Sequence, residues 1–259
     1  MTQYIFLSHD VDWRRQGPLA DHILARKDRF DESVLKNIKN SNPYHNIPEY
    51  MEIEEKYHVR STFFFRTVYE NGNYLDYSDD IKTLVKEGWE IGLHSDLSSL
   101  GSLENVSKEK TAIEKLVGTK IVGNRFHCLG FDDMLLNNLQ DLGFVYDSTM
   151  KKSKDKVVSD DFGHLVLDRL VEFPITLMDA YIFTYMKLSE DEIIPFFEKV
   201  LQHGRSINNS FNIITVLWHS NVLKMKGGRM YTKILEFLVS QDDVKICRGI
   251  DLAKKVTAG

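Results

Sequence analysis

The stretch Ile5-Phe6-Leu7-Ser8-His9-Asp10-Val11-Asp12-Trp13 ends a short apolar run with two carboxylates one residue apart. Such a run is typical of a buried strand, and parallel sheets carry their functional groups at the C-terminal ends of strands. Because side chains alternate along a strand, we expect Asp10 and Asp12 to point the same way. Two like charges at one strand end repel each other, and a bound cation would relieve the repulsion. The other interpretation is a pair of loop aspartates that cap the next segment.

Strand-like runs, rich in aromatic or β-branched residues, recur along the whole chain. They lie at 4–9, 61–66, 89–94, 121–126, 144–146, 171–175, 212–219 and 244–247. Between most of them, apolar residues at three- and four-residue spacing predict helices at 47–57, 79–87, 104–117, 132–142, 190–203, 229–240 and 250–256. Strands that alternate with helices predict an α/β fold with a parallel sheet, and we favour an irregular (β/α) barrel.

We expect one domain spanning residues 1–259, because the sequence has no internal repeat, Pro-rich linker or shift in composition. The segment 17–46 is polar and charged, has no strand pattern and contains the turn Ser41-Asn42-Pro43-Tyr44. It is expected to be an insertion after the first strand and to lie over the proposed site.

Composition narrows the class of protein. With 259 residues, 42% hydrophobic and 27% charged, the chain can bury a large core, and its apolar runs fall short of the roughly 18 residues that span a bilayer. We therefore expect no membrane insertion. The first residues lack the basic segment of a signal peptide, which favours the cytoplasm.

The charges and cysteines exclude other classes of site. A net charge of -5 argues against nucleic-acid binding, and the lysine-rich stretch 151–156 is interpreted as a solvated loop. Cys128 and Cys247 are far apart and have no zinc-ribbon or disulfide spacing, so we expect two reduced thiols.

Polar side chains follow three further predicted strands. These strand ends read Gly92-Leu93-His94-Ser95, Arg125-Phe126-His127 and Leu217-Trp218-His219-Ser220-Asn221. One histidine at a strand end is more often structural than a ligand, but three together with an aspartate pair favour a metal site. Carboxylate and imidazole ligands suit zinc or another divalent first-row metal. Since such a metal brings the pKa of bound water to about 7, the pattern predicts hydrolysis.

The order of these motifs resembles the polysaccharide deacetylase (NodB-homology, carbohydrate esterase) family over essentially the whole chain. The matching features are Asp-x-Asp after the first strand, a His-Ser motif, an arginine motif and a late Leu-x-His. The opening Ser-His-Asp-Val-Asp-Trp and the late Leu-Trp-His-Ser-Asn look most like divergent members associated with surface-polysaccharide biosynthesis. The resemblance implies an irregular β/α barrel that uses a divalent metal to remove an N-acetyl or O-acetyl group from a sugar.

By this resemblance, Asp10 is the base that takes a proton from the attacking water, and Asp12 and His94 are metal ligands. The family's His-Ser/Thr-x-x-His motif has a serine here, Ser98, where its second histidine would stand. The family's arginine motif continues with x-Pro-Tyr, whereas this chain has His127 at the proline position. We interpret His127 as the replacement ligand; the alternative is a histidine that binds substrate or packs beside the arginine.

Further roles follow from the same resemblance. Arg125 would keep Asp10 oriented and ionised, or would form a merely structural buried ion pair with it. His219 matches the acid that protonates the leaving amine, and it needs a carboxylate neighbour to remain protonated. Asp179 in Met178-Asp179-Ala180-Tyr181-Ile182-Phe183 could be that neighbour, or a plain loop aspartate.

Substrate contacts are predicted for Trp13, Trp218 and Asn221, with Tyr181 and Phe183 as further rings that could stack on a sugar. Aromatic side chains beside strand ends also commonly belong to the core. The two interpretations exclude each other for any one ring, because an aromatic ring buried in the core cannot contact the substrate.

The resulting hypothesis is a metal-dependent carbohydrate N-deacetylase. Its expected substrate is an acetylated sugar in nucleotide-linked, lipid-linked or free form, and removal of another small acyl group such as formyl stays open. The alternative is a sugar-binding or scaffolding barrel that lost its metal through the change at Ser98. The presence of Asp10, Arg125 and His219, which a scaffold would not need, argues against that alternative. No Gly-rich strand-to-helix turn supports a phosphate-binding α/β enzyme of the P-loop or dinucleotide type.

Overall fold

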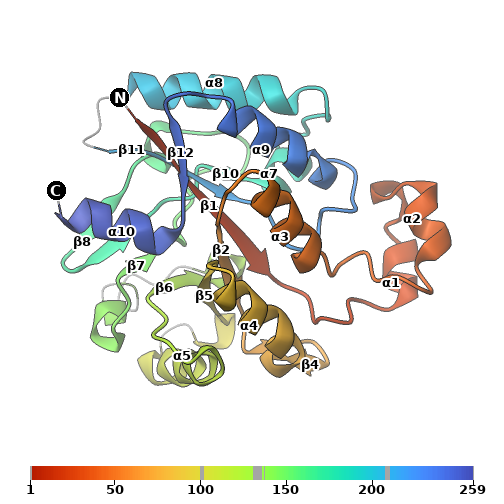
Figure 1. Cartoon of the computed structure of the whole chain (residues 1–259), viewed down its shortest axis with the longest axis horizontal. Coiled ribbons are helices and arrows are strands. Elements are labelled where there is room, and N and C mark those ends of the chain that lie inside the picture. Colours follow the sequence, from red (N-terminus) through yellow and green to blue (C-terminus); the bar gives the residue numbers. More distant parts are fainter. Residues whose placement is uncertain (1, 100–101, 131–135, 137, 208–210, 259) are drawn as a thin grey trace.

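A curled, mostly parallel β-sheet forms the centre of the protein (Figure 1). The structure is a computed structural model, and it describes residues 2–99, 102–130, 136, 138–207 and 211–258. Within these residues, ten strands form one sheet and two form a separate hairpin. The strands of the sheet are β1 (Gln3–Val11), β2 (Thr62–Phe65), β5 (Glu90–Ser95), β6 (Gly123–Phe126), β7 (Tyr146–Asp147), β8 (Leu165–Leu167), β9 (Leu170–Glu172), β10 (Leu177–Met178), β11 (Asn212–Leu217) and β12 (Val244–Cys247), and the hairpin is β3 (Val68–Tyr69) with β4 (Gly72–Asn73).

The strand order is β10-β11-β1-β2-β5-β6-β7-β9-β8, and only the last pair, β9 with β8, is antiparallel in this sheet. The long strand β1 lies at the centre and pairs with β11 on one side. On its other side β1 pairs first with β12, over Gln3 to Phe6, and then with β2, over Ser8 to Val11. All strands that end in a predicted site residue are therefore parallel and close together.

The chain between β9 and β10 runs from one end of the sheet to the other. β9 pairs with β7, whereas β10 pairs with β11 at the opposite end of the strand order. Between them Ile175 N donates to Met150 O at 2.8 Å and Thr176 N donates to Thr215 O at 3.0 Å. The predicted strand 171–175 is thus present only at its start: β9 ends at Glu172, and an irregular crossing leads to β10. The crossing gives the curled sheet the distorted barrel form that was predicted.

Helices surround the sheet, with α8 and α9 along the top of Figure 1 and α4 and α5 along the bottom. Their bounds are α1 (Ala20–Leu24), α2 (Glu32–Asn37), α3 (Ile47–Lys56), α4 (Ser78–Lys86), α5 (Leu103–Val117), α7 (Asp179–Thr184), α8 (Ile193–Ser206), α9 (Tyr231–Val239) and α10 (Gly249–Ala258), and the short 3-10 turns are η1 (Lys27–Arg29), η2 (Tyr74–Tyr77), η3 (Leu97–Ser99), η4 (His127–Leu129), η5 (Leu139–Leu142), η6 (Ser159–Asp161) and η7 (Gly228–Met230).

Most predicted helices are present within a few residues of their expected bounds. The predicted helix 132–142 lies in part outside the described residues: 132–135 and 137 are outside them, 136 and 138 are helical, and 139–142 form a 3-10 turn. Helix α8 begins at Ile193, three residues later than predicted, and buries Phe197, Val200 and Leu201.

The segment 17–46 contains α1, η1 and α2, and extends at the right of Figure 1 beyond the end of β1. As predicted, this segment contains no strand of a sheet. Phe30 does form one isolated antiparallel bridge, with Met225. Phe30 packs with Ile23, Tyr44 and Met225 in a small cluster of its own. The segment therefore has its own apolar contacts and is fastened to the loop after β11.

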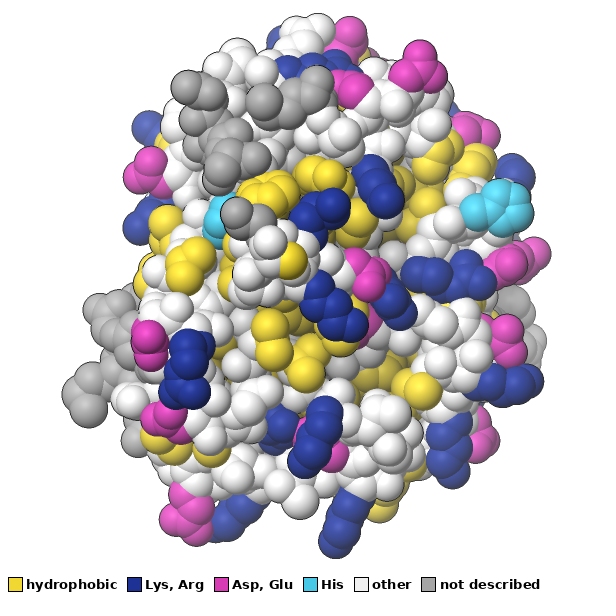
Figure 2. Space-filling model, turned by 60° about the vertical axis from the view of Figure 1, so that its left-hand side comes forward, with side chains coloured by type: hydrophobic (Ala, Val, Ile, Leu, Met, Phe, Trp, Pro, Cys, Tyr) yellow, Lys and Arg dark blue, Asp and Glu magenta, His cyan; other side chains and the backbone are white. Residues whose placement is uncertain are grey.

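Phe63 and Phe65 of β2 are fully buried in the main hydrophobic core, and Phe64, which points the other way, is buried in a second cluster with Phe6 and Tyr146. Figure 2 shows the side where the termini and β8 lie: positive and negative side chains are interspersed there, and hydrophobic ones gather near the middle. Among the described residues, no helix combines the length and the apolar character that crossing a membrane requires.

Candidate active site

Three side chains from the ends of β1, β5 and β6 meet at the C-terminal edge of the sheet, where β2 lies between β1 and β5. Asp12 follows β1, His94 lies near the end of β5, and His127 follows β6. Asp12 Oδ1 lies 3.2 Å from His94 Nε2 and 3.3 Å from His127 Nδ1, and the two ring nitrogens are 3.3 Å apart. These three residues are the group within the described chain whose donor atoms are spaced to hold a metal ion, all within 4.8 Å of one another.

The backbone fixes which nitrogen of His94 faces this cluster. His94 Nδ1 lies 2.9 Å from the carbonyl oxygen of Arg125, so this nitrogen donates to the backbone and Nε2 faces the Asp12 carboxylate. After His127, the chain turns through two left-handed residues, Cys128 (φ 55°) and Leu129 (φ 52°). Such φ values are rare in residues with side chains, and strained turns of this kind cluster at functional sites.

The pKa of Asp12 is shifted by its neighbours in the cluster. Burial alone would raise the pKa of Asp12, but hydrogen bonds from His127 and His94 and the charge of His219 outweigh it and hold the pKa well below its ordinary value. For His94, burial lowers the pKa, and the neighbouring carboxylates of Asp10 and Asp12 raise it to a net increase. The cluster therefore favours a charged carboxylate surrounded by imidazoles.

Asp10 and Arg125 form a buried ion pair directly below this cluster. Arg125 is fully buried and donates from Nη1 to Asp10 Oδ1 at 2.8 Å and to Ser8 Oγ at 3.0 Å. The same guanidinium donates to the carbonyl oxygen and the hydroxyl of Ser148, at 2.6 and 2.8 Å. The other oxygen of Asp10, Oδ2, lies 3.6 Å from His94 Nε2. As alternation along β1 predicted, Asp10 and Asp12 face the same site.

His219 lies on the other side of Asp12 and is held by Asp179. Its Nδ1 lies 2.5 Å from Asp179 Oδ1, and its backbone N donates to Asp179 Oδ2 at 3.2 Å. Its Nε2 lies 3.4 Å from Asp12 Oδ2. Burial lowers the pKa of His219, but the charge and hydrogen bond of Asp179, with smaller contributions from Asp12 and Asp10, raise it to about 10.

Comparison with known proteins gives no match by sequence and several by structure. No family model and no curated protein matches the chain. A structure named a polysaccharide deacetylase, from Mycobacterium smegmatis, superposes with a TM-score of 0.67 at 22% identity, covering 99% of this chain and 91% of that chain. PuuE allantoinase superposes with a TM-score of 0.66 at 14% identity, covering 98% and 90%.

A CE4-family pseudoenzyme from Bacillus anthracis also matches, with a TM-score of 0.56 at 15% identity, covering 97% of this chain and 66% of that chain. A mutant of that pseudoenzyme is described as having restored enzymatic activity. The chain has the fold of the polysaccharide deacetylases. At these identities the likeness establishes the architecture of the protein and not its chemistry.

Within this polysaccharide deacetylase fold, Ser98 lies apart from the three-residue cluster. It is exposed on η3, and its backbone N and hydroxyl both donate to Asp96 Oδ1, at 3.0 and 2.9 Å. The other oxygen of Asp96 pairs with Arg66. Burial raises the pKa of Asp96, but the Ser98 and Arg66 contacts lower it to about 2. Asp96 is thus engaged by these partners, and the third donor of the cluster comes from His127.

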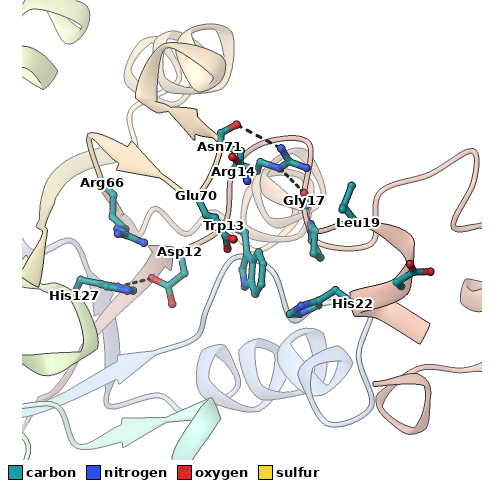
Figure 3. A pocket seen from close by; sticks show the side chains of 12 residues that line it. Asp12, Trp13, Arg14, Gly17, Leu19, His22, Arg66, Glu70, Asn71 and His127 are labelled. Carbon is teal, nitrogen blue, oxygen red and sulfur yellow. Dashed lines mark hydrogen bonds and ion pairs between the residues drawn. The ribbon is translucent and has the colours of Figure 1, made fainter. Parts of the chain in front are cut away.

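Two cavities open on either side of Asp12. The first, of about 490 Å³, is lined by Trp13, Arg66 and His127 among others (Figure 3). In that view the ring of Trp13 lies between Asp12 and His22. The second cavity, of about 600 Å³, reaches His219, Asp179 and Asn221 and is walled by the segment 17–46. The segment 17–46 thus borders the site.

The predicted substrate-binding residues differ in their access to these cavities. Trp13 lines both cavities, and Asn221 and Phe183 line the second. Trp218, by contrast, is fully buried in the core, and its Nε1 donates to the carbonyl oxygen of Gly228 at 3.0 Å. The structure therefore corrects the expectation that Trp218 contacts substrate. Tyr181 lines a third cavity, beside Cys128 and the 151–154 loop.

Several residues at the site were missed from the sequence. Ser8 and Ser148 both bond to Arg125, and Arg66 lines the first cavity. Ser8 lies two residues before Asp10 on the same face of β1, and Arg66 directly follows β2. The alternation and strand-end rules that found Asp10 and His94 would therefore have found these two residues also.

Proposed function

We propose that this protein is a metal-dependent hydrolase that removes an N-acetyl or other small acyl group from a sugar. The observation that carries the proposal is the Asp12, His94 and His127 cluster, with the Asp10–Arg125 pair on one side and the His219–Asp179 pair on the other. A scaffold would gain no stability from holding three ionisable side chains around one point, whereas a hydrolase requires such a cluster.

The donor atoms fit a single divalent ion. Zinc–nitrogen and zinc–oxygen bonds are about 2.1 Å, so two ligands of one ion lie no more than about 4.2 Å apart. The separations of 3.2 to 3.3 Å within the cluster satisfy this limit. One carboxylate with two imidazoles is a donor set that suits zinc and leaves positions open for water and substrate. When bound, such an ion supplies Lewis acidity and lowers the pKa of a coordinated water.

The residues of the chain supply the proton transfers. Asp10 Oδ1 is fixed by Arg125, so Oδ2 remains turned toward the cluster, where it can take a proton from the attacking water. His219 is charged at neutral pH because Asp179 raises its pKa, and its Nε2 faces the cluster from the opposite side. It is therefore placed to donate a proton to the departing nitrogen of an amide.

The cavities suit a substrate with a ring. Trp13 presents an aromatic ring beside Asp12, and aromatic rings stack on the apolar faces of sugars. Asn221 offers an amide to hydroxyl or acetamido groups in the second cavity. We infer a cytoplasmic reaction on an acylated sugar precursor of surface polysaccharide, rather than on a finished polymer.

Metal content and acetate release together test the proposal. We would measure both on the wild-type protein and on Asp12→Ala and His127→Ala, with Ser98→Ala as the matched control, because Ser98 bonds to Asp96 and not to the cluster. The expected result is close to one divalent ion per chain in the wild type and in Ser98→Ala, with loss of metal and of acetate release in the other two variants. A wild type that binds no zinc, cobalt or nickel would favour the non-catalytic sugar-binding barrel instead.

A further inference from the structure

Three arginines of the segment after β1 differ from the other arginines of the chain. Every other arginine forms an ion pair with a carboxylate. For Arg14, Arg26 and Arg29, the described residues provide no such partner, and all three line the two cavities beside Asp12. Arg14 donates to the carbonyl oxygens of Gly17 and Asn71. Arg26 and Arg29 both line the second cavity, the one that reaches Asp179 and His219.

A third cation, Lys226, joins Arg26 and Arg29 on the wall of this cavity. Lys226 comes from the loop after β11, almost two hundred residues further along the chain. Its backbone N donates to the carbonyl oxygen of Arg29 at 2.8 Å, and the adjacent residues Phe30 and Met225 form an antiparallel bridge. The backbone thus holds Lys226 next to Arg29, and both residues line the same cavity.

The loop that carries Lys226 is fixed on its other side as well. Gly227 has φ +79°, and a Cβ on it would lie 2.6 Å from the ring of Phe183, so the backbone packs directly on that ring. Its N donates to Glu190 Oε1 at 2.6 Å, and Glu190 also accepts from Arg229, which pairs in addition with Asp31. Arg229 therefore forms ion pairs with Glu190 and Asp31, the carboxylates next to this wall. Lys226 lines the cavity.

The net charge of this cavity wall indicates which class of ligand it suits. Three cations line this cavity together with three carboxylates. Asp12 belongs to the metal-ligand cluster and Asp179 pairs with His219, which leaves Asp28 as the remaining carboxylate on the wall. His22, also on the wall, has its pKa lowered by burial and by the charge of Arg26, so it adds a neutral donor. A wall with a surplus of more than one positive charge suits a phosphate or diphosphate better than a single carboxylate, and arginine binds phosphate oxygens in pairs.

We propose that Arg26, Arg29 and Lys226 bind a phosphate group of the substrate, so that the acyl group reaches the Asp12 cluster while the phosphate lies under the 17–46 segment. This inference rests on the proposed function and specifies its substrate: an acylated sugar linked to phosphate or diphosphate. A sugar nucleotide and a polyprenyl-phosphate sugar share this chemistry, and both extend from the anomeric carbon.

Steady-state kinetics of acetate release test the proposal. The substrates are an N-acetylhexosamine as its neutral methyl glycoside, its nucleoside diphosphate and its polyprenyl diphosphate. The variants are Arg26→Gln, Arg29→Gln and Lys226→Gln, and the matched control is Lys27→Gln, which removes one positive charge from the same turn η1 but does not line the cavity. For the phosphorylated substrates, each cavity variant is expected to raise KM about tenfold or more with kcat retained. The neutral glycoside and Lys27→Gln should be unaffected. Whichever phosphorylated substrate has the higher kcat/KM identifies the source of the phosphate.

A binding measurement separates this inference from the proposed function. Calorimetric titration of the holoenzyme with inorganic diphosphate should give binding that weakens in Arg29→Gln and Lys226→Gln but not in Lys27→Gln. If diphosphate binding weakens in Arg29→Gln and Lys226→Gln while no substrate releases acetate, the phosphate site is supported and the proposed acyl hydrolysis is contradicted. If acetate is released equally well from neutral and phosphorylated sugars in all variants, the phosphate site is overturned and the proposed function stands. Diphosphate binding that is the same in all four proteins would also overturn the site.

Discussion

Arg125 contacts two groups of the active site by separate means: its guanidinium donates to Asp10, and its carbonyl oxygen accepts from His94 Nδ1 at 2.9 Å. One residue of β6 therefore orients both the proposed base and a proposed metal ligand. Register makes this possible, because His94 of β5 and Arg125 of β6 are direct partners across the two parallel strands. The side chain and the backbone of Arg125 thus link the proposed base, Asp10, to the proposed metal ligand His94.

Replacing Arg125 by Met should destabilise the protein strongly. Arg125 is fully buried and Asp10 nearly so, and removal of one member of a buried pair leaves an uncompensated charge, at a cost of about 3–5 kcal/mol. The free energy of unfolding in urea measures this cost. The double variant Arg125→Met/Asp10→Asn should recover part of the lost free energy of unfolding. Ser148→Ala removes one hydrogen-bond partner of Arg125 and should lower the free energy of unfolding less than Arg125→Met or the double variant does. A single variant as stable as the wild type would mean that Asp10 is not charged in the folded protein.

Asp179→Asn should reduce the rate of acetate release about 10²- to 10⁴-fold without loss of metal. The amide cannot supply the negative charge that raises the pKa of His219 to about 10, so that pKa should fall toward its ordinary value. As a consequence, the alkaline limb of the pH–rate profile should move to lower pH. Asp28→Asn is the matched control, because Asp28 lines the same cavity without bonding to His219. An unchanged profile in Asp179→Asn would exclude His219 as the acid.

The positions of Asp10, Asp12, His94, Arg125 and His219 could be predicted from the sequence because each is at or just after the end of a strand. Parallel strands bring their C-terminal ends to one edge, so strand assignment alone brings these residues together. The error at Trp218 has the same origin. Trp218 directly precedes His219, and neighbouring side chains on an extended segment face opposite ways, so a ring beside a site residue points into the core.

Other features depend on contacts that no local pattern encodes. The bridge between Phe30 and Met225 joins segments far apart in the chain, so the sequence could place the 17–46 segment over the site but could not show which cations it brings together. The two left-handed residues after His127 are Cys128 and Leu129, neither of which is a residue type that indicates such a turn. The crossing between β9 and β10 likewise follows from the pairing of β9 with β7 and of β10 with β11, and not from the composition of that segment.

Glu54 is expected to matter for stability and not for catalysis. It is fully buried beneath β1, where its Oε1 contacts His9 Nε2, Ser61 Oγ and Tyr231 OH at 2.7 to 2.9 Å and its Oε2 accepts from Trp89 Nε1 at 2.7 Å. Glu54→Gln places an amide N–H among these donors and should lower the free energy of unfolding by about 1–3 kcal/mol. Thermal unfolding measures the effect.

The exposed residue Glu236 provides the control for this prediction, because it accepts from Tyr57 OH at the surface. Glu236→Gln should change stability by no more than about 0.5 kcal/mol. Acetate release per folded molecule should match the wild type in both variants. A loss of turnover in folded Glu54→Gln would mean that His9 and Glu54 act on the site through β1.

Two buried carboxyl groups below the site are expected to share a proton. Asp147 and Glu172 are partners across β7 and β9, and Glu172 Oε2 and Asp147 Oδ2 are buried without a hydrogen-bond donor in the described chain. Burial, and then the charge of Asp147, raise the pKa of Glu172 well above its usual 4.5. Above pH 4.5 the unfolded chain therefore releases a proton that the folded protein keeps, so this pair makes the protein less stable as the pH rises.

Glu172→Gln should remove that pH dependence. The amide oxygen can still accept from the backbone N of Thr149 and Met150, as Oε1 does at 3.1 and 2.8 Å, while its N–H donates to Asp147. Urea unfolding at pH 5 and pH 8 should show the variant gaining stability relative to the wild type at the higher pH. Glu172→Ala, which leaves both backbone N–H groups without an acceptor, should be less stable than Glu172→Gln at either pH. If the difference between Glu172→Gln and the wild type is the same at both pH values, Glu172 is ionised in the folded protein and the two carboxyl groups do not share a proton.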